Sequence, residues 1–176
     1  AMATVRIATS GAAKLPDEVA RKVQQRFGLR LTEGYGLTET SPVVATSNGL
    51  PDAPLGSIGR PISGVSMRLV DPDGDDVLIG DEGEVWVKGP NVFHGYWNDA
   101  EATAAALTPD GWLRTGDLAV VNDDGYLFLV DRAKDLIIVS GFNVFPAEVE
   151  EVVMLMDGVR ACAIVGVPHP HTGEAV

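Results

Sequence analysis

The spacing of apolar residues near the N-terminus predicts a strand, a helix and a second strand. Between residues 16 and 27, apolar side chains recur every four positions, and Gly28 follows directly, which is typical of a helix and its end. Short apolar runs on either side predict strands over residues 4–9 and 29–34. Two strands joined by a helix through short connections are typical of the end of a layered α/β sheet.

The middle of the chain carries patterns typical of β-structure. Residues 41–63 are rich in proline, glycine and serine, so we expect a loop there. The sequence Asn122-Asp123-Asp124-Gly125 predicts a tight hairpin turn, and a short alanine-rich helix is expected over residues 100–107. The expected strands are residues 65–70, 83–88, 118–121 and 126–130.

The C-terminal part predicts a strand, a helix and a strand over residues 136–139, 146–156 and 159–167. In the helix, four apolar side chains share one face, and the glutamates lie largely off it. The fold class is therefore α/β, or mixed α+β: the end of a layered α/β sheet, a β-rich subdomain, and the first strand–helix–strand of a small α+β domain. Nothing follows to cover this last unit, so we expect a fragment whose exposed apolar surface favours self-association.

Composition narrows the classes of partner. The 176 residues hold 13 lysine and arginine residues against 25 aspartate and glutamate residues, a formal net charge of −12. This charge argues against a nucleic-acid surface and against an anionic membrane, but a few local groups can still bind a phosphate ligand. No apolar run is long enough to span a membrane. The single cysteine, Cys162, excludes a disulfide within the chain and mildly favours a cytoplasmic location.

Two short segments are candidate sites on chemical grounds. His169-Pro170-His171 could ligate a metal, but no further ligand supports it, and a solvated loop is the preferred interpretation. Tyr35-Gly36-Leu37-Thr38-Glu39 follows a predicted strand end, where open α/β sheets place ligands. There an aromatic ring can stack on a base, a hydroxyl can hold a phosphate oxygen and a carboxylate can hold Mg²⁺. An ordinary turn followed by an N-cap threonine is an equally good interpretation of these residues alone.

A series of motifs runs in one order along nearly the whole chain. They are Ser10-Gly11-Ala12-Ala13, Tyr35-Gly36-Leu37-Thr38-Glu39, Gly83-Glu84-Val85 with Gly95-Tyr96-Trp97-Asn98 and Gly111-Trp112, Arg114-Thr115-Gly116-Asp117-Leu118, Asp131-Arg132-Ala133-Lys134-Asp135, and the segment 140–150. With these motifs the chain resembles the adenylate-forming superfamily of acyl-CoA synthetases, firefly luciferase and adenylation domains of peptide synthetases. The run Ile138-Val139-Ser140-Gly141 looks more like fatty-acyl-CoA ligases than peptide synthetases.

The resemblance implies a nucleotide site. Thr38 would contact the AMP phosphate, Glu39 would ligate Mg²⁺, and these two would be the catalytic residues. Asp117 would accept both ribose hydroxyls, and Arg132 would reach the ribose as a donor. The adenine pocket would be formed by Gly11, Ala12, Gly34 and Tyr35.

The same resemblance implies a division of the chain. Residues 1–133 would be the end of a large AMP-binding domain, and residues 134–176 the truncated start of a small C-terminal domain. Lys134 would be the hinge between them. Ser140, Gly141 and Phe142 would approach the pantetheine arm of coenzyme A.

Each role has a plainer alternative. Asp117 could cap a turn, Arg132 could form a surface ion pair, and the segment 131–135 could be a connector. Tyr96 and Trp97 could be site residues, but they are expected to lie in the core, because the resemblance implies a structural role for that block.

The implied reaction joins a small carboxylic acid to coenzyme A at the expense of ATP, through acyl-AMP. The family's phosphate loop would lie before residue 1 and its catalytic lysine after Val176, so the chain alone is expected to be inactive. The alternatives are a fragment of another adenylate-forming enzyme (an aryl ligase, an acyl-AMP ligase or a luciferase-like oxygenase) and a non-catalytic domain for nucleotide sensing or docking.

Overall fold

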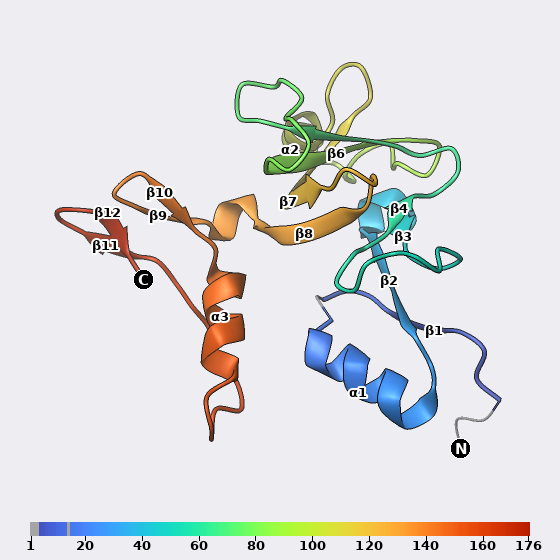
Figure 1. The fold of residues 1–176 in the computed structure, drawn as a ribbon. Helices are drawn as coiled ribbons and strands as arrows, with labels where there is room; N and C mark the ends of the chain where they lie inside the picture. The colour runs from blue at the N-terminus through green and yellow to red at the C-terminus, as the bar shows by residue number, and fades with distance from the viewer. Residues whose placement is uncertain (1–3, 14) are drawn as a thin grey trace.

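The computed structural model describes residues 4–13 and 15–176 and confirms a mixed α+β fold (Figure 1). In this part of the chain the strands form three four-stranded sheets, with the orders β1-β2-β3-β4, β5-β6-β7-β8 and β10-β9-β12-β11. The helices are α1 Asp17–Phe27, α2 Ala100–Ala106 and α3 Pro146–Met154, with 3₁₀ turns η1 Thr38–Thr40 and η2 Ala133–Asp135. None of the helices in the described residues is long and apolar enough to cross a membrane.

The first sheet begins with the predicted strand–helix–strand unit. Its strands are β1 Ala8–Ser10, β2 Leu31–Gly36, β3 Val43–Thr46 and β4 Arg60–Pro61. The parallel pair β1–β2 starts at Ala8 opposite Leu31, so β1 is shorter than expected and β2 lies two residues further along. The loop expected over residues 41–63 is wrong in part. Val44 and Ala45 are fully buried there, so this proline- and glycine-rich segment gains a strand that pairs antiparallel with β2.

The second sheet is an antiparallel meander. Its strands are β5 Ser66–Val70, β6 Gly83–Lys88, β7 Leu113–Val121 and β8 Leu127–Arg132. β7 begins five residues before the expected 118–121, because Leu113 pairs with Val87 and is almost fully buried. Irregular pairing beside Glu84 and between Leu118 and Ala119 lets the longer strand bend.

One hydrophobic core unites the first two sheets. Its buried members are Tyr35, Val44, Ala45, Ile58, Leu69, Val85, Val87, Leu113, Ala119 and Leu127. Backbone hydrogen bonds from Ile58 N to Leu127 O (3.0 Å) and from Leu127 N to Gly59 O (3.0 Å) join the sheets directly. These contacts hold the end of β2 at a fixed place beside β7 and β8.

The third sheet lies to one side with α3, beyond β8 and η2 (Figure 1). Its strands are β9 Ile137–Val139, β10 Phe142–Val144, β11 Val167–His169 and β12 Gly173–Ala175. The strand expected over residues 159–167 is wrong, since only Val167 belongs to a strand. The segment leading to it binds α3 instead of a neighbouring strand: Ile164 N donates to Glu150 Oε1 at 2.9 Å.

Asp131 links β8 to α3. Its Oδ1 accepts a hydrogen bond from Arg132 N at 2.8 Å, and its Oδ2 accepts one from Ala147 N at 3.1 Å. Ala147 lies in the first turn of α3, where backbone N–H groups have no partner within the helix. The Asp131 carboxylate therefore satisfies a donor that a helix end leaves open.

Alanine in place of Asp131 is expected to loosen the start of α3. Loss of a carboxylate that caps a helix costs about 1 kcal/mol, so the Ala147 amide should exchange with solvent roughly fivefold faster. Hydrogen exchange read by NMR would measure this. Asp135→Ala is the matched control, because Asp135 is exposed in the adjacent η2. Equal protection of Ala147 in both variants would contradict the linkage.

Candidate functional site

A cavity of about 610 Å³ opens where the end of β2 meets β7 and β8. Its walls come from the segment after β1, from β2 and η1, from β7 and β8, and from the first turn of α3. The lining residues that carry polar groups are Ser10, Glu33, Tyr35, Thr38, Glu39, Thr115, Asp117, Asp131 and Arg132. The cavity thus gathers hydroxyl, carboxylate and guanidinium groups from separate parts of the chain.

Tyr35, Asp117 and Arg132 form a connected triad at this cavity. The Tyr35 hydroxyl donates to Asp117 Oδ2 at 2.7 Å, and Arg132 Nε lies 3.3 Å from Asp117 Oδ1. Burial and then the Asp117 carboxylate raise the pKa of the Tyr35 phenol far above its usual range, so Tyr35 stays a neutral donor. The Asp117 side chain is 11% exposed and that of Arg132 is 59% exposed, so the pair points from the protein interior toward solvent.

The local structure of β7 aims Asp117 at β2. Gly116 has a φ of +73°, a conformation that residues with a Cβ rarely adopt. Three hydrogen bonds hold this kink: Gly116 N donates to Glu84 Oε1, Asp117 N to the Thr115 hydroxyl, and that hydroxyl to Val85 O. These bonds fix the backbone on either side of Asp117, whose carboxylate faces Tyr35.

Thr38 and Glu39 lie in η1, directly after β2. The buried Thr40 hydroxyl fixes this turn, since it accepts from Leu37 N at 2.9 Å and donates to Pro42 O at 2.7 Å. Thr38 is exposed at the cavity and Glu39 is half-buried there. A hydroxyl and a carboxylate thus face the same cavity as the triad.

The donor set at this cavity fits a cation that is shared with phosphate groups. No cluster of three or more His, Cys, Asp or Glu side chains with metal-binding geometry occurs in residues 4–13 and 15–176, and His169 and His171 are exposed. Mg²⁺ commonly needs only one or two carboxylates when substrate phosphates and water supply its other ligands. Glu39 is such a carboxylate: it is half-buried at the cavity, and its Oε1 accepts a hydrogen bond from the Tyr96 hydroxyl at 2.8 Å.

The structure brings together most of the residues expected at a nucleotide site. Ala12, Gly34, Tyr35, Thr38, Glu39, Asp117 and Arg132 all line the cavity. Gly11 lies beside it, since a Cβ built on Gly11 would be 3.5 Å from Gly34 O. The roles of these residues toward a ligand stay predictions.

The remaining expected residues lie elsewhere. Lys134 is exposed in η2, and Ser140, Gly141 and Phe142 form the turn and start of the β9–β10 hairpin, none of them lining the cavity. Phe142 is 75% exposed. Sequence reasoning named no site role for Thr115, Asp131 or Ala147, although all three fall inside the motifs, which was the available signal.

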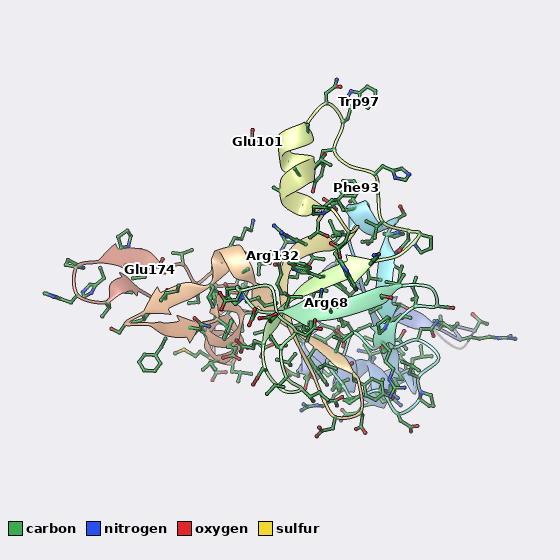
Figure 2. All side chains as sticks on the ribbon, turned by 90° about the horizontal axis from the view of Figure 1, so that it is seen from above. Arg68, Phe93, Trp97, Glu101, Arg132 and Glu174 are labelled. Atoms are coloured by element: carbon green, nitrogen blue, oxygen red, sulfur yellow. The ribbon has the colours of Figure 1, made fainter. Side chains whose placement is uncertain are left out.

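The expectation that Tyr96 and Trp97 lie in the core is wrong. Trp97 is 91% exposed at the outer tip of the segment that leads to α2, and Tyr96 is 41% exposed (Figure 2). The reason is local: α2 stands out from the second sheet, and the segment before it turns back toward η1 rather than into the core.

Comparisons with known proteins identify the family of the chain. Residues 1–97 match a family model described as AMP-binding enzyme. The chain is 48% identical over 173 residues to a long-chain-fatty-acid–CoA ligase of Yersinia pestis, covering 98% of this chain and 31% of the relative. It is 43% identical to a feruloyl-CoA synthase of an Amycolatopsis species, covering 98% of this chain and 35% of that protein.

A solved structure shares the fold. ATP-bound MatB from Rhodopseudomonas palustris superimposes with a TM-score of 0.89 at 40% identity, over 96% of this chain and 34% of that one. The chain spans about a third of the length of the relatives that it matches. With the family model covering more than half of its residues, the chain belongs to the family of AMP-binding enzymes.

Proposed function

We propose that this chain is the nucleotide-facing part of an ATP-dependent acyl-CoA ligase. Its domain boundary would lie near Lys134, between residues 1–133 and 134–176. The observation that supports this most is the triad of Tyr35, Asp117 and Arg132 beside η1, at one cavity. Its partners are a carboxylic acid, ATP and coenzyme A, and its predicted location is cytoplasmic.

Five residues of the cavity have a role in this proposal. The Asp117 carboxylate accepts the two ribose hydroxyls, because it offers two acceptor oxygens, and Arg132 adds a charged donor. The Tyr35 ring flanks adenine, and the Thr38 hydroxyl donates to a phosphate oxygen. When bound, Mg²⁺ neutralises charge on the phosphates, with Glu39 as the protein ligand.

The reaction has two balanced steps. A carboxylate oxygen attacks the α-phosphorus of ATP, the bond to pyrophosphate breaks, and acyl-AMP forms. The thiol of coenzyme A then attacks the acyl carbon, gives up its proton, and AMP leaves. In both steps the residues of this chain hold the nucleotide in place. Holding the reacting groups in the right geometry is the main way in which they lower the barrier to the transfer.

The relatives favour thioester formation, since the names of both relatives compared above are those of CoA-dependent enzymes. One is named for a fatty acid and the other for ferulate, at similar identity to this chain. The proposed acyl substrate is therefore an aliphatic or an aromatic carboxylic acid.

A chimera tests the proposed function. This chain would replace the matching segment of the Yersinia ligase, and thioester formation would be measured with a long-chain fatty acid, ATP and coenzyme A. We expect a folded chimera with measurable activity, and the 176-residue chain alone with no ATP–pyrophosphate exchange. The same chimera with Arg132→Ala is the matched control and should have a higher KM for ATP.

Two outcomes would count against the proposal. A folded chimera that binds AMP but forms no acyl-AMP would exclude an adenylating role for these residues. Acyl-AMP without thioester would instead favour an acyl-AMP ligase, the alternative within the same superfamily.

A further inference from the structure

A tyrosine far along the chain contacts the predicted metal ligand. The Tyr96 hydroxyl donates to Glu39 Oε1 at 2.8 Å, across 57 residues of sequence. A phenol O–H is a donor and a carboxylate oxygen is an acceptor, so the contact fixes Tyr96 as the donor and Glu39 as the acceptor. Nothing in the proposed nucleotide site assigns a role to this contact.

Two contacts hold Tyr96 in place, one at its ring and one at its backbone. It packs edge-on against Phe93, with ring centroids 4.9 Å apart at 76°. Its backbone N donates to the Thr103 hydroxyl of α2 at 2.9 Å. The neighbouring Gly95 permits this close approach, because a Cβ there would lie 2.6 Å from Thr103 Cγ2. Phe93 therefore holds the ring and α2 holds the backbone of Tyr96, even though the residue is partly exposed.

The same segment also fixes the backbone of η1. Phe93 N donates to Glu39 O at 2.8 Å, and Asn91 Nδ2 donates to Thr40 O at 2.9 Å. Backbone and side chain of Glu39 are thus both held by residues 91–96. Figure 2 shows Phe93 at the base of this segment and Trp97 pointing away at its tip.

We propose that Tyr96 is a positioning residue that orients the Glu39 carboxylate toward the cation accompanying the nucleotide phosphates. Its hydroxyl occupies Oε1 and leaves Oε2 to the cation. A carboxylate that a hydrogen bond already holds in place loses less conformational freedom when it binds a metal. Loss of such a supporting hydrogen bond commonly lowers the metal affinity by about 10- to 100-fold. The inference rests on the proposed nucleotide site.

Paramagnetic NMR tests the proposal without activity. The ¹⁵N-labelled chain would be saturated with AMP, up to millimolar concentration, and then titrated with Mn²⁺. We expect AMP to shift the Tyr35 and Asp117 amides, and Mn²⁺ to broaden the amides of η1. In Tyr96→Phe the same broadening should require about tenfold more Mn²⁺, because the ring stays but the donor is lost.

Trp97→Phe is the matched control, since its side chain is exposed on the same segment. Thermal unfolding of each variant shows whether the fold is retained. Equal Mn²⁺ titrations of the wild type and Tyr96→Phe, or equal losses in both variants, would overturn the role of Tyr96 and leave the nucleotide site standing. AMP shifts without broadening at η1 would also overturn it. A chain without AMP shifts would overturn this inference, which needs a nucleotide site within these residues, and would leave the proposed function to the chimera.

Discussion

Asparagine in place of Asp117 is expected to weaken AMP binding by roughly 10- to 100-fold, the range that corresponds to losing hydrogen bonds to a charged group. Asparagine has one acceptor oxygen where the carboxylate has two, so it cannot accept both ribose hydroxyls. It also leaves the Arg132 guanidinium, 3.3 Å away, without its opposite charge. Isothermal titration of AMP, with and without Mg²⁺, would measure the change.

The matched control is Tyr35→Phe. It removes the hydroxyl that donates to Asp117 Oδ2 but keeps the ring and the carboxylate. We expect its AMP affinity to stay within about threefold of the wild type, since only one neutral donor is lost. If Asp117→Asn bound AMP as tightly as the wild type, Asp117 would be a structural partner of Tyr35 and not a nucleotide ligand.

The sequence predicted correctly those elements that are determined by residues close together in the chain. The spacing of Val19, Val23 and Phe27 with the stop at Gly28 placed α1 almost to the residue. The elements that failed depend on distant partners. β3 forms in a segment of loop-like composition because it pairs with β2. Residues 159–166 are mostly apolar, as in a buried strand, but the segment hydrogen-bonds to α3 instead.

The same contrast between local and long-range information applies to the candidate site. Motifs that resemble a known family supplied the expected site residues, and most of these residues line one cavity, while their roles toward a ligand stay predictions. It could not predict their contacts, because the Tyr35–Asp117 hydrogen bond joins residues 82 positions apart. The Tyr96–Glu39 contact was missed for a further reason: the resemblance implied a structural, core role for the block that holds Tyr96, and only the path of the chain shows it turning toward η1.

Among the glycine-to-alanine substitutions at this site, Gly36→Ala is expected to destabilise the fold most. Gly36 ends β2 directly before η1, and a Cβ there would lie 1.7 Å from Pro42 O and 2.9 Å from Val43 Cα. Both are backbone atoms: Val43 is the first residue of β3, and Pro42 directly precedes it. The clash therefore cannot be relieved by the movement of a side chain. The strand pair must separate locally, which costs about 3 kcal/mol in the free energy of unfolding.

For a domain of this size, that loss lowers the melting temperature by roughly 6–12 °C. Thermal unfolding followed by circular dichroism would measure it. Gly34→Ala is the matched control, two residues earlier in the same strand, where a Cβ would meet Ala45 O at an ordinary 3.7 Å. Because the separation at Gly36 would also displace Thr38 and Glu39, AMP binding should fall with stability in Gly36→Ala. Equal melting temperatures for the two variants would mean that β2 and β3 do not approach as closely at Gly36 as the structure shows, and the rigid placement of η1 would have to be abandoned.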